Sequence, residues 1–246
     1  MKIILFLIYL VPLLVVELAI IALTCLLTFA FDRDRRIVHG ISHIMSGTIT
    51  YLSVLWRMKT CGMDNIGRGK SYVVTVNHHS MIDIPVCYSL PLFFKWVSKR
   101  EVLKMPLFGW VLRLRGDIAI ERGGVASTMN LFKRTRELTS RGCSVIIFPE
   151  GTRSKSGAMG RFKDGAFIMA KDNDVEILPV VINYTMRGRR LFGKTVNIPC
   201  RIELKALRPV DIETVRQKSA GELRDMVRDI MVAEHKASHP ELYAQQ

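Results

Sequence analysis

Two polar side chains five positions apart, His78 and Asp83, are suited to act together as a general base. They follow the β-branched run 72–76, which predicts a buried strand, and Asp83 falls in the first turn of the helix expected next. One strand-to-helix turn can therefore bring the carboxylate to the imidazole. A carboxylate bonded to one ring nitrogen fixes the tautomer and leaves the other nitrogen free to take a proton from a hydroxyl. We predict that His78 is this base.

The neighbouring His79 is the competing base. It lies only four positions before Asp83, and if the strand geometry continues, its side chain points to the opposite side of the chain from that of His78. The pair also has a plain alternative, because a histidine followed by an aspartate near a helix start is often an N-cap with a neighbour. The assignment therefore depends on what the rest of the chain supplies.

Glu150 and Arg153 lie in a second segment, 148–154, that follows the apolar run 145–147. This run predicts a buried parallel strand, and a proline and a glycine then end it. The two charged side chains are thus expected in a loop at a strand end. A guanidinium can grip a phosphate with two parallel hydrogen bonds, which favours a phosphorylated substrate. The alternative is a surface turn with an exposed ion pair.

These two segments resemble the first and third motifs of the glycerolipid acyltransferase superfamily, the group that includes bacterial 1-acyl-sn-glycerol-3-phosphate acyltransferase. Segments 116–122 and 177–182 resemble its second and fourth motifs, and all four occur in the expected order. The connecting segment 98–110 is similar as well. The resemblance covers about residues 60–210. It is specific for the superfamily and much less so for the substrate.

The resemblance implies that His78, oriented by Asp83, removes the proton from the free sn-2 hydroxyl of a 1-acyl-sn-glycerol-3-phosphate. The oxygen then attacks an acyl thioester, with acyl-acyl carrier protein or acyl-coenzyme A as co-substrate, and phosphatidic acid forms without a covalent acyl-enzyme. Glu150 would orient the hydroxyl, and no bound cofactor or metal ion is implied. The substrate-binding residues that the resemblance implies are Lys99, Arg122, Glu150, Gly151, Thr152 and Arg153.

Other functions stay open at this point. Within the superfamily, the acceptor could be a lyso-ornithine lipid, another lysophospholipid or glycerol-3-phosphate. A serine esterase could use Ser80, but the Gly-x-Ser-x-Gly elbow is missing and Ser80 lies too close to His78 in sequence. A non-catalytic membrane-bound scaffold would have no need of His78, Asp83 and Glu150 together.

The chain opens on a long apolar segment. Residues 3–31 are apolar apart from Glu17 and two threonines, and a continuous helix of that length would measure roughly 43 Å against a hydrocarbon core of about 30 Å. Such a helix would tilt, or Pro12 and Glu17 would divide it into a bent or re-entrant element. A secretory signal peptide fits poorly, because the apolar stretch is too long and no clear small-residue cleavage site follows. We expect a retained membrane anchor.

A second helix is expected over 37–58, with an apolar stripe that either packs on the catalytic domain or lies on the membrane. The stripe consists of Val38, Ile41, Met45, Leu52 and Leu55. The basic cluster at 33–36, between the two helices, places the remainder of the chain in the cytoplasm by the positive-inside rule. The expected address is therefore the inner membrane, with the catalytic domain facing the cytoplasm.

The net charge and the cysteines agree with a location on the cytoplasmic side of the membrane. The formal net charge of +14 would draw the domain to anionic membrane lipid, and acyl carrier protein is a further acidic partner that the resemblance allows. Nucleic acid is not expected, since no helix-turn-helix, zinc-finger or RNA-binding signature accompanies the charge. The five cysteines are scattered without metal spacing, which favours reduced thiols.

The elements that must position these side chains alternate along the chain. Strands are expected at 72–76, 95–98, 117–121, 144–148, 177–182 and 198–205, and helices at 82–90, 124–141, 162–172 and 214–236. This alternation predicts an α/β fold with a mixed or mostly parallel sheet flanked by helices. We expect an N-terminal anchor and amphipathic helix over 1–58, a catalytic domain over 59–240 and a frayed tail over 241–246.

Overall fold

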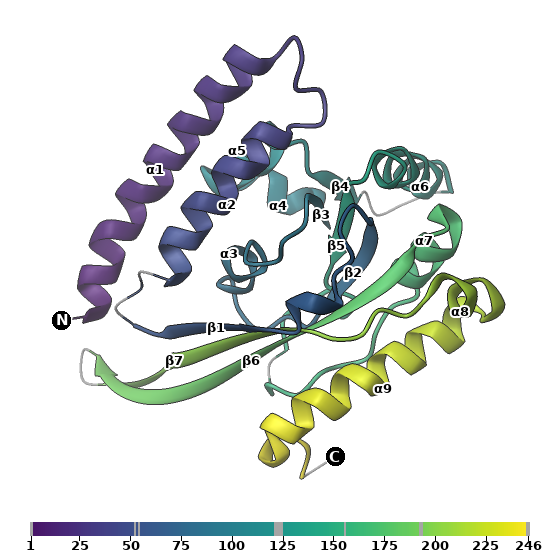
Figure 1. Ribbon diagram of the computed structural model, residues 1–246. Coiled ribbons are helices and arrows are strands. Elements are labelled where there is room, and N and C mark those ends of the chain that lie inside the picture. The colour runs from purple at the N-terminus through teal and green to yellow at the C-terminus, as the bar shows by residue number, and fades with distance from the viewer. Residues whose placement is uncertain are drawn as a thin grey trace.

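The fold is built on one seven-stranded sheet with helices on both faces (Figure 1). The computed structural model describes residues 2–51, 53, 55–120, 125–154, 156–191 and 194–244. The strand order is β1-β7-β6-β2-β5-β3-β4, with β6 and β7 antiparallel and the other paired strands parallel. The strands are β1 (Arg57–Cys61), β2 (Tyr72–Val76), β3 (Phe94–Lys99), β4 (Ile118–Ile120), β5 (Ser144–Ile147), β6 (Glu176–Leu191) and β7 (Lys194–Ala206). The predicted mostly parallel α/β sheet is confirmed.

The central strands are apolar runs because both of their faces are covered. Successive side chains of β2 enter opposite cores, so that Val73 packs with Val145 on one face while Val74 packs with Ile146 on the other. All five residues of β2 are buried. This two-sided burial fixes the strand that leads into His78.

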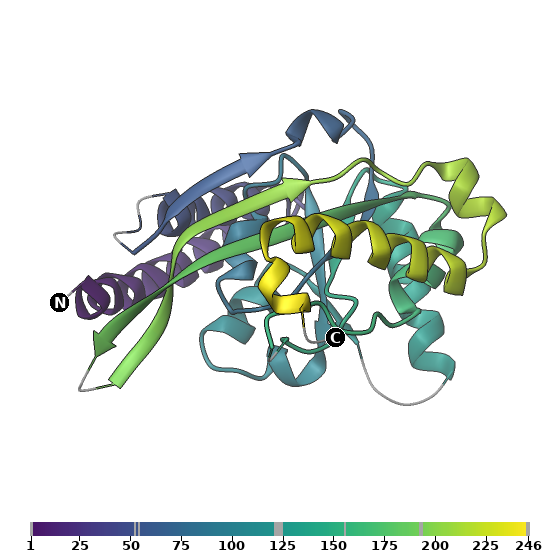
Figure 2. The same cartoon turned by 90° about the horizontal axis from the view of Figure 1, so that it is seen from below.

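Helices divide between the two faces. The first face carries α1 (Lys2–Thr28), α2 (Arg36–Tyr51), α3 (Asp83–Cys87), α4 (Arg100–Leu103) and α5 (Phe108–Leu114). The second face carries α6 (Val125–Thr139), α7 (Gly165–Asn173), α8 (Ile212–Gln217) and α9 (Ala220–Ser238). Short 3-10 turns cover Met63–Asn65 and Pro240–Tyr243. Figure 2 shows α9 lying across the second face of the sheet.

Several predicted boundaries were wrong. The second helix ends at Tyr51 rather than 58, and residues 57–61 form the edge strand β1 beside β7, so the expected boundary after residue 58 cuts a strand. The reason is that this segment alternates polar and apolar side chains and is only half-buried at the sheet edge. The helix expected over 214–236 is two helices. A capping box between Ser219 and Glu222 starts α9 and separates it from α8.

The first helix, α1, runs unbroken past Pro12 and packs against α2 and α5. Glu17 does not divide it. Its side chain is buried, and burial raises its pKa while the Arg115 guanidinium partly offsets that shift. The one acidic residue of the helix therefore faces protein. In the part of the chain that the structure describes, no helix combines the length and the apolar character needed to cross a membrane.

The predicted stripe of the second helix packs on protein. Val38 is buried with Ile21 and Val111, and Ile41 lies at the edge of that cluster. Met45 is half-buried, Leu55 belongs to the main core, and Leu52 lies outside the described residues. The stripe thus joins α2 to α1, to α5 and to the main core. Of its two expected roles, packing on protein is the one that the structure shows.

The end of the chain is more ordered than expected. The turn at Pro240–Tyr243 follows α9, and the Tyr243 hydroxyl contacts both the Met159 amide and the ring of His235. These contacts hold the turn onto the domain, so the predicted frayed tail is wrong as far as residue 243.

Candidate active site

His78 and Asp83 meet at the carboxyl end of β2. His78 lies two residues past the strand, and Asp83 begins α3. The intervening turn brings the Asp83 Oδ2 atom to 2.6 Å from His78 Nδ1. The predicted contact is confirmed. Because Asp83 engages Nδ1, Nε2 is the ring nitrogen left to accept a proton.

Asp83 is completely buried, and both oxygens of its carboxylate accept hydrogen bonds. Oδ2 accepts the backbone N–H groups of His79 at 2.7 Å and Ser80 at 2.9 Å, and Oδ1 accepts the hydroxyl of Tyr184 on β6. A buried carboxylate needs such donors, since leaving it unpaired is costly. Sequence reasoning missed Tyr184. Its only signal is the alternation along β6 that turns it to the same side as Ile182.

The His78 ring is held from a second direction by Phe148. The two rings stack with centroids 3.9 Å apart and an angle of 11° between their planes. The His78 side chain keeps 15% of its surface exposed. The imidazole is therefore fixed in orientation but still reachable by a substrate.

His79 points away from this site. Its ring stacks on His235 at 5.3 Å and meets Tyr184 edge-on at 5.9 Å. Burial lowers the pKa of His79. The predicted opposite orientation of the two histidines is confirmed, and the ranking of their catalytic roles stays a prediction.

Glu150 ties the two polar segments together. Its Oε1 atom accepts the His78 backbone N–H at 3.0 Å, and its Oε2 atom accepts the Gly160 N–H at 2.9 Å. The side chain is 8% exposed, and burial raises its pKa while these two hydrogen bonds pull the pKa down. The geometry gives Glu150 a bridging position between loops. Its expected contact with a substrate hydroxyl stays a prediction.

The loop after Glu150 presents a cation. Thr152 and Arg153 are exposed, and no hydrogen bond within the described chain engages the Arg153 guanidinium. The next residue, Ser154, donates its N–H to the His78 carbonyl at 2.8 Å, which holds the loop beside His78. A guanidinium on a fixed loop is well suited to a phosphate.

Gly151 allows a close approach that sequence reasoning missed. Its φ of +68° is left-handed, and a Cβ there would lie 2.8 Å from Lys163 Nζ. The Lys163 ammonium therefore lies over the loop as a second cation. Lys163 falls just before α7, in a stretch that the sequence predicted as helix.

Lys99 lies at the same edge of the sheet. It is the last residue of β3 and is half-buried, in register with Ile120, the last residue of β4. Since β2, β5, β3 and β4 are parallel neighbours, their carboxyl ends share one edge. Arg122, predicted to bind the acceptor, lies outside the described residues. In the described chain, no group of three or more His, Cys, Asp or Glu side chains is placed to hold a metal ion.

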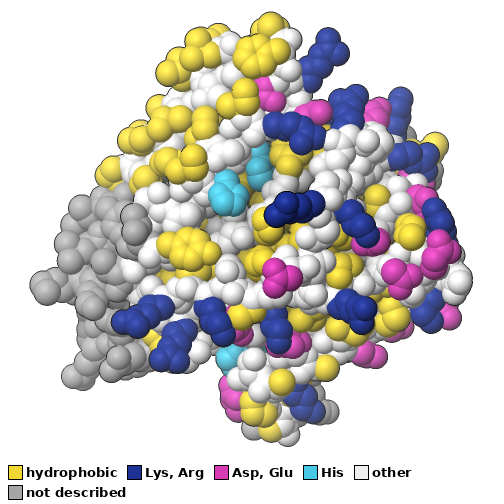
Figure 3. All heavy atoms as spheres, in the orientation of Figure 1, with side chains coloured by type: hydrophobic (Ala, Val, Ile, Leu, Met, Phe, Trp, Pro, Cys, Tyr) yellow, Lys and Arg dark blue, Asp and Glu magenta, His cyan; other side chains and the backbone are white. Residues whose placement is uncertain are grey.

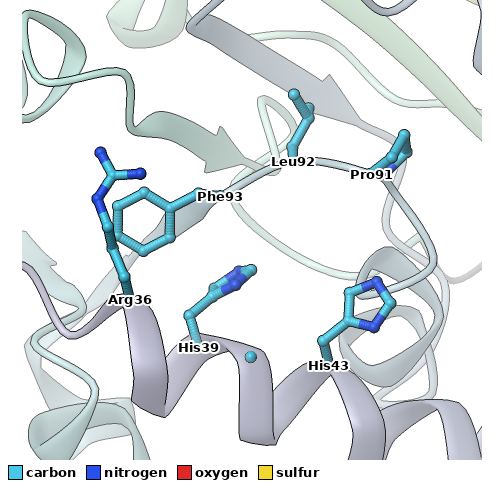
Figure 4. Close-up of a pocket in the computed structure, with 7 residues that line it drawn as sticks. Arg36, His39, His43, Pro91, Leu92 and Phe93 are labelled. Carbon is cyan, nitrogen blue, oxygen red and sulfur yellow. The ribbon is translucent and has the colours of Figure 1, made fainter. Parts of the chain in front are cut away.

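A separate hollow lies at the other edge. It is lined by Arg36, His39 and His43 of α2 and by residues 91–93, just before β3 begins (Figure 4). Because β3 ends at the same edge of the sheet as the strand that leads into His78, this hollow lies at the opposite edge. It is distinct from the site described above.

Comparison with known proteins gives the family. A family model described as Acyltransferase matches residues 57–183, which include both His78 and Arg153. The chain belongs to this acyltransferase family. The matched region ends one residue before Tyr184, so much of β6 and all of β7, α8 and α9 lie beyond it.

The chain is also similar to individual acyltransferases. The chain is 36% identical over 155 residues to the chloroplastic 1-acyl-sn-glycerol-3-phosphate acyltransferase BAT2 of Brassica napus, covering 62% of the chain and 44% of that protein. It is 29% identical over 195 residues to the 1-acyl-sn-glycerol-3-phosphate acyltransferase of Pseudomonas aeruginosa, covering 75% and 74%. The chain thus spans less than half the length of the chloroplastic relatives from Brassica napus and Arabidopsis thaliana.

The fold has a solved counterpart. The crystal structure of the 1-acyl-sn-glycerophosphate (LPA) acyltransferase PlsC from Thermotoga maritima superposes with a TM-score of 0.69 at 24% identity, over 99% of this chain and 98% of that one. The whole chain therefore shares that fold.

Two buried histidines predict an acid-sensitive fold. Burial lowers the pKa of both His39 and His235 to about 3, whereas an unfolded histidine titrates near about 6.5. Between these pH values the two histidines are protonated in the unfolded state but neutral in the folded state. The free energy of unfolding therefore falls as the pH drops from about 6.5 toward 3. Going from pH 7.5 to 5 should cost about 2 kcal/mol of unfolding free energy per histidine.

The measurement is the pH slope of the unfolding free energy of the detergent-solubilised chain. His39→Gln should flatten that slope by about half of the joint contribution of His39 and His235. His43→Gln is the matched control, because His43 is exposed one turn further along α2. A slope that His39→Gln leaves unchanged would contradict the assignment.

Proposed function

We propose that this protein transfers an acyl group from an acyl thioester to the free sn-2 hydroxyl of 1-acyl-sn-glycerol-3-phosphate, making phosphatidic acid. The observation that carries the proposal is the His78–Asp83 pair, 2.6 Å apart, with the Arg153 loop bonded to the His78 backbone. Arg153 is thereby one residue from a backbone contact with His78, which supports the pairing of a base for the hydroxyl with a cation for the phosphate. The names of the matched relatives support the choice of acceptor.

The reaction runs in one addition and one elimination. His78 Nε2 takes the hydroxyl proton as the oxygen attacks the thioester carbonyl, and Asp83 stabilises the imidazolium that forms. The tetrahedral intermediate then breaks its carbon–sulfur bond. The leaving thiolate takes the proton back from His78, so that the enzyme returns to its starting state and no acyl-enzyme is formed.

The cations of the site would bind the acceptor phosphate. We assign this role to Arg153, with Lys99, Arg122 and Lys163 as further cations around it. Gly151 and Thr152 shape the loop, and Glu150 fixes it against the His78 backbone. Binding energy at the phosphate would then orient the sn-2 hydroxyl toward the base.

A thioester assay tests the proposal. The purified chain should consume acyl-acyl carrier protein or acyl-coenzyme A only when lysophosphatidic acid is present, with equal phosphatidic acid formed. Consumption without an acceptor would favour an esterase, and no consumption would favour a scaffold. Faster reaction with a lyso-ornithine lipid, another lysophospholipid or glycerol-3-phosphate would move the assignment to that acceptor.

We also propose that α1 and α2 seat the protein on the inner membrane with the catalytic domain toward the cytoplasm. Apolar side chains gather on the outer side of these helices (Figure 3). The exposed ones are Val15, Val16, Ile20, Leu23, Leu26, Leu27, Phe29, Phe31, Ile37 and Ile44. Large contiguous apolar surfaces mark membrane or partner sites. The basic cluster at 33–36 supports the cytoplasmic side.

Membrane partition should depend on this surface. Leu26 and Phe29 are each 75% exposed, so the double variant Leu26→Ser/Phe29→Ser should lower binding to phospholipid vesicles roughly 10-fold or more with little loss of stability. The matched control is Met129→Ser/Ile168→Ser, which removes two exposed apolar side chains from α6 and α7. Vesicle co-sedimentation at high salt is the measurement. Equal loss in both double variants would show that the outer side of α1 has no special role.

A further inference from the structure

The C-terminal segment reaches the loop that follows Arg153. The Tyr243 hydroxyl accepts the Met159 N–H at 3.1 Å and shares a 2.9 Å hydrogen bond with His235 Nδ1 on α9. From the same helix, Arg228 Nε donates to the Gly160 carbonyl at 2.9 Å. Two side chains from the last part of the chain, Tyr243 and Arg228, thus bond the backbone at 159 and 160, and His235 holds the Tyr243 hydroxyl.

Those two residues are directly coupled to the catalytic pair. The Gly160 N–H donates to Glu150 Oε2, and Glu150 Oε1 accepts the His78 N–H. A continuous series of hydrogen bonds therefore leads from Tyr243 through residues 159–160 and Glu150 to the backbone of His78. Each member is fixed by the one before it.

A second contact route joins α9 to the same pair. His235 is 2% exposed, and its ring stacks on His79. The His79 N–H in turn donates to Asp83 Oδ2 at 2.7 Å. The histidine that packs behind the base is thus covered by the helix that also holds Tyr243.

The loop itself is shaped to receive the C-terminal turn. Gly157 has a φ of +87°, and a Cβ there would lie 3.2 Å from Leu242 Cδ1. Ser154 closes the loop by donating its hydroxyl to the Ala158 carbonyl at 2.6 Å. Arg153 therefore directly precedes the residue that bonds the His78 carbonyl, and the stretch that follows contacts residues 242 and 243.

We propose that Tyr243, with Arg228 and His235, positions the 150–160 loop, so that the C-terminal segment sets the affinity for the phosphorylated acceptor. None of these three residues needs to touch substrate. They are positioning residues: Tyr243 and Arg228 act through the backbone of Met159 and Gly160, and His235 acts through Tyr243. This inference rests on the proposed function, since it assigns the acceptor phosphate to Arg153.

The sharpest test removes one oxygen atom. Tyr243→Phe keeps the ring and loses the hydroxyl bonds, so the acceptor KM should rise about 3- to 10-fold while the donor KM and kcat change less. Amide hydrogen exchange at 154–160 should quicken by roughly the same factor. The matched control is Tyr51→Phe, because Tyr51 is exposed on α2 and far from this loop in the fold.

A second pair of variants tests the helix. Arg228→Ala should act in the same direction as Tyr243→Phe, whereas Arg224→Ala, one turn earlier, removes bonds to Asp164 and Asp225 and should leave the acceptor KM unchanged. An acceptor KM and a loop exchange rate equal to those of the unmodified chain in both Tyr243→Phe and Arg228→Ala would overturn the proposal. Equal changes in donor and acceptor KM would also overturn it, since that pattern indicates general loosening.

The exchange measurement separates this inference from the proposed function. If the unmodified chain consumed no thioester, the acyltransferase assignment would fail, yet faster exchange at 154–160 in Tyr243→Phe would still support loop positioning by the C-terminal turn. Normal acyl transfer with unchanged exchange and acceptor KM would reject the positioning role alone.

Discussion

Replacing His78 by alanine is expected to lower turnover by at least about 10²-fold, because the alkoxide would then have to form without a base. The protein should stay folded, since the His78 side chain is partly exposed and contributes one side-chain bond to Asp83. The measurement is single-turnover acyl transfer at saturating donor and acceptor, with membrane binding checked in parallel.

His79→Ala is the matched control for this variant. His79 turns to His235 and lacks a side-chain bond to Asp83, so its loss should cost much less turnover per folded molecule. It removes a half-buried ring that packs on both His235 and Tyr184, however, and should cost more stability than His78→Ala. The reverse ranking in turnover would move the base to His79. Near-normal turnover in both variants would eliminate the proposed chemistry.

Arg153→Ala should reduce kcat/KM for lysophosphatidic acid by roughly 10- to 10³-fold, because a charge-assisted contact to the phosphate is lost. Arg153→Lys should restore only part of the lost kcat/KM, since lysine lacks the planar guanidinium that can donate two parallel hydrogen bonds to a phosphate. The donor KM should change much less. Arg161→Ala is the matched control, because Arg161 is also an exposed arginine in the segment between Glu150 and α7.

An acceptor without phosphate makes this test specific. The kcat/KM for a lyso-ornithine lipid should fall little when Arg153 is replaced, whereas the kcat/KM for lysophosphatidic acid should fall by most of its value. Equal losses for both acceptors would mean that Arg153 shapes the loop and does not bind phosphate. A preference of the unmodified enzyme for the acceptor without phosphate would overturn the proposed substrate.

Short-range features of this protein could be read from its sequence. The runs at 72–76 and 144–147 are mostly apolar because both faces of those strands are covered. Consecutive residues therefore have to be suited to burial, and such a run can be recognised in the sequence. The contact between His78 and Asp83 is equally local, because one strand-to-helix turn spans it. Motif order added the family, which the family model confirms.

Boundaries were less predictable than the elements themselves. The apolar stripe of α2 is similar in character to the half-buried edge strand that follows, so the sequence did not show where helix ends and β1 begins. Glu17 was ambiguous for a related reason. An acidic residue in an apolar helix can break it or face a protein surface, and only the packing of α1 against the domain placed it on the buried side.

The sequence by itself determined the fold class, the contact of His78 with the Asp83 carboxylate, and the loop that carries Arg153. Only the tertiary structure decided which distant groups complete them: the Tyr184 hydroxyl on Asp83, the two backbone amides on Glu150, and Tyr243 on the 159–160 backbone. The physical reason is the distance along the chain over which each kind of interaction acts. Propensity and spacing act over a few residues, whereas the partner of a buried carboxylate or a loop amide is whichever donor or acceptor the packed sheet and helices bring to it from anywhere in the chain.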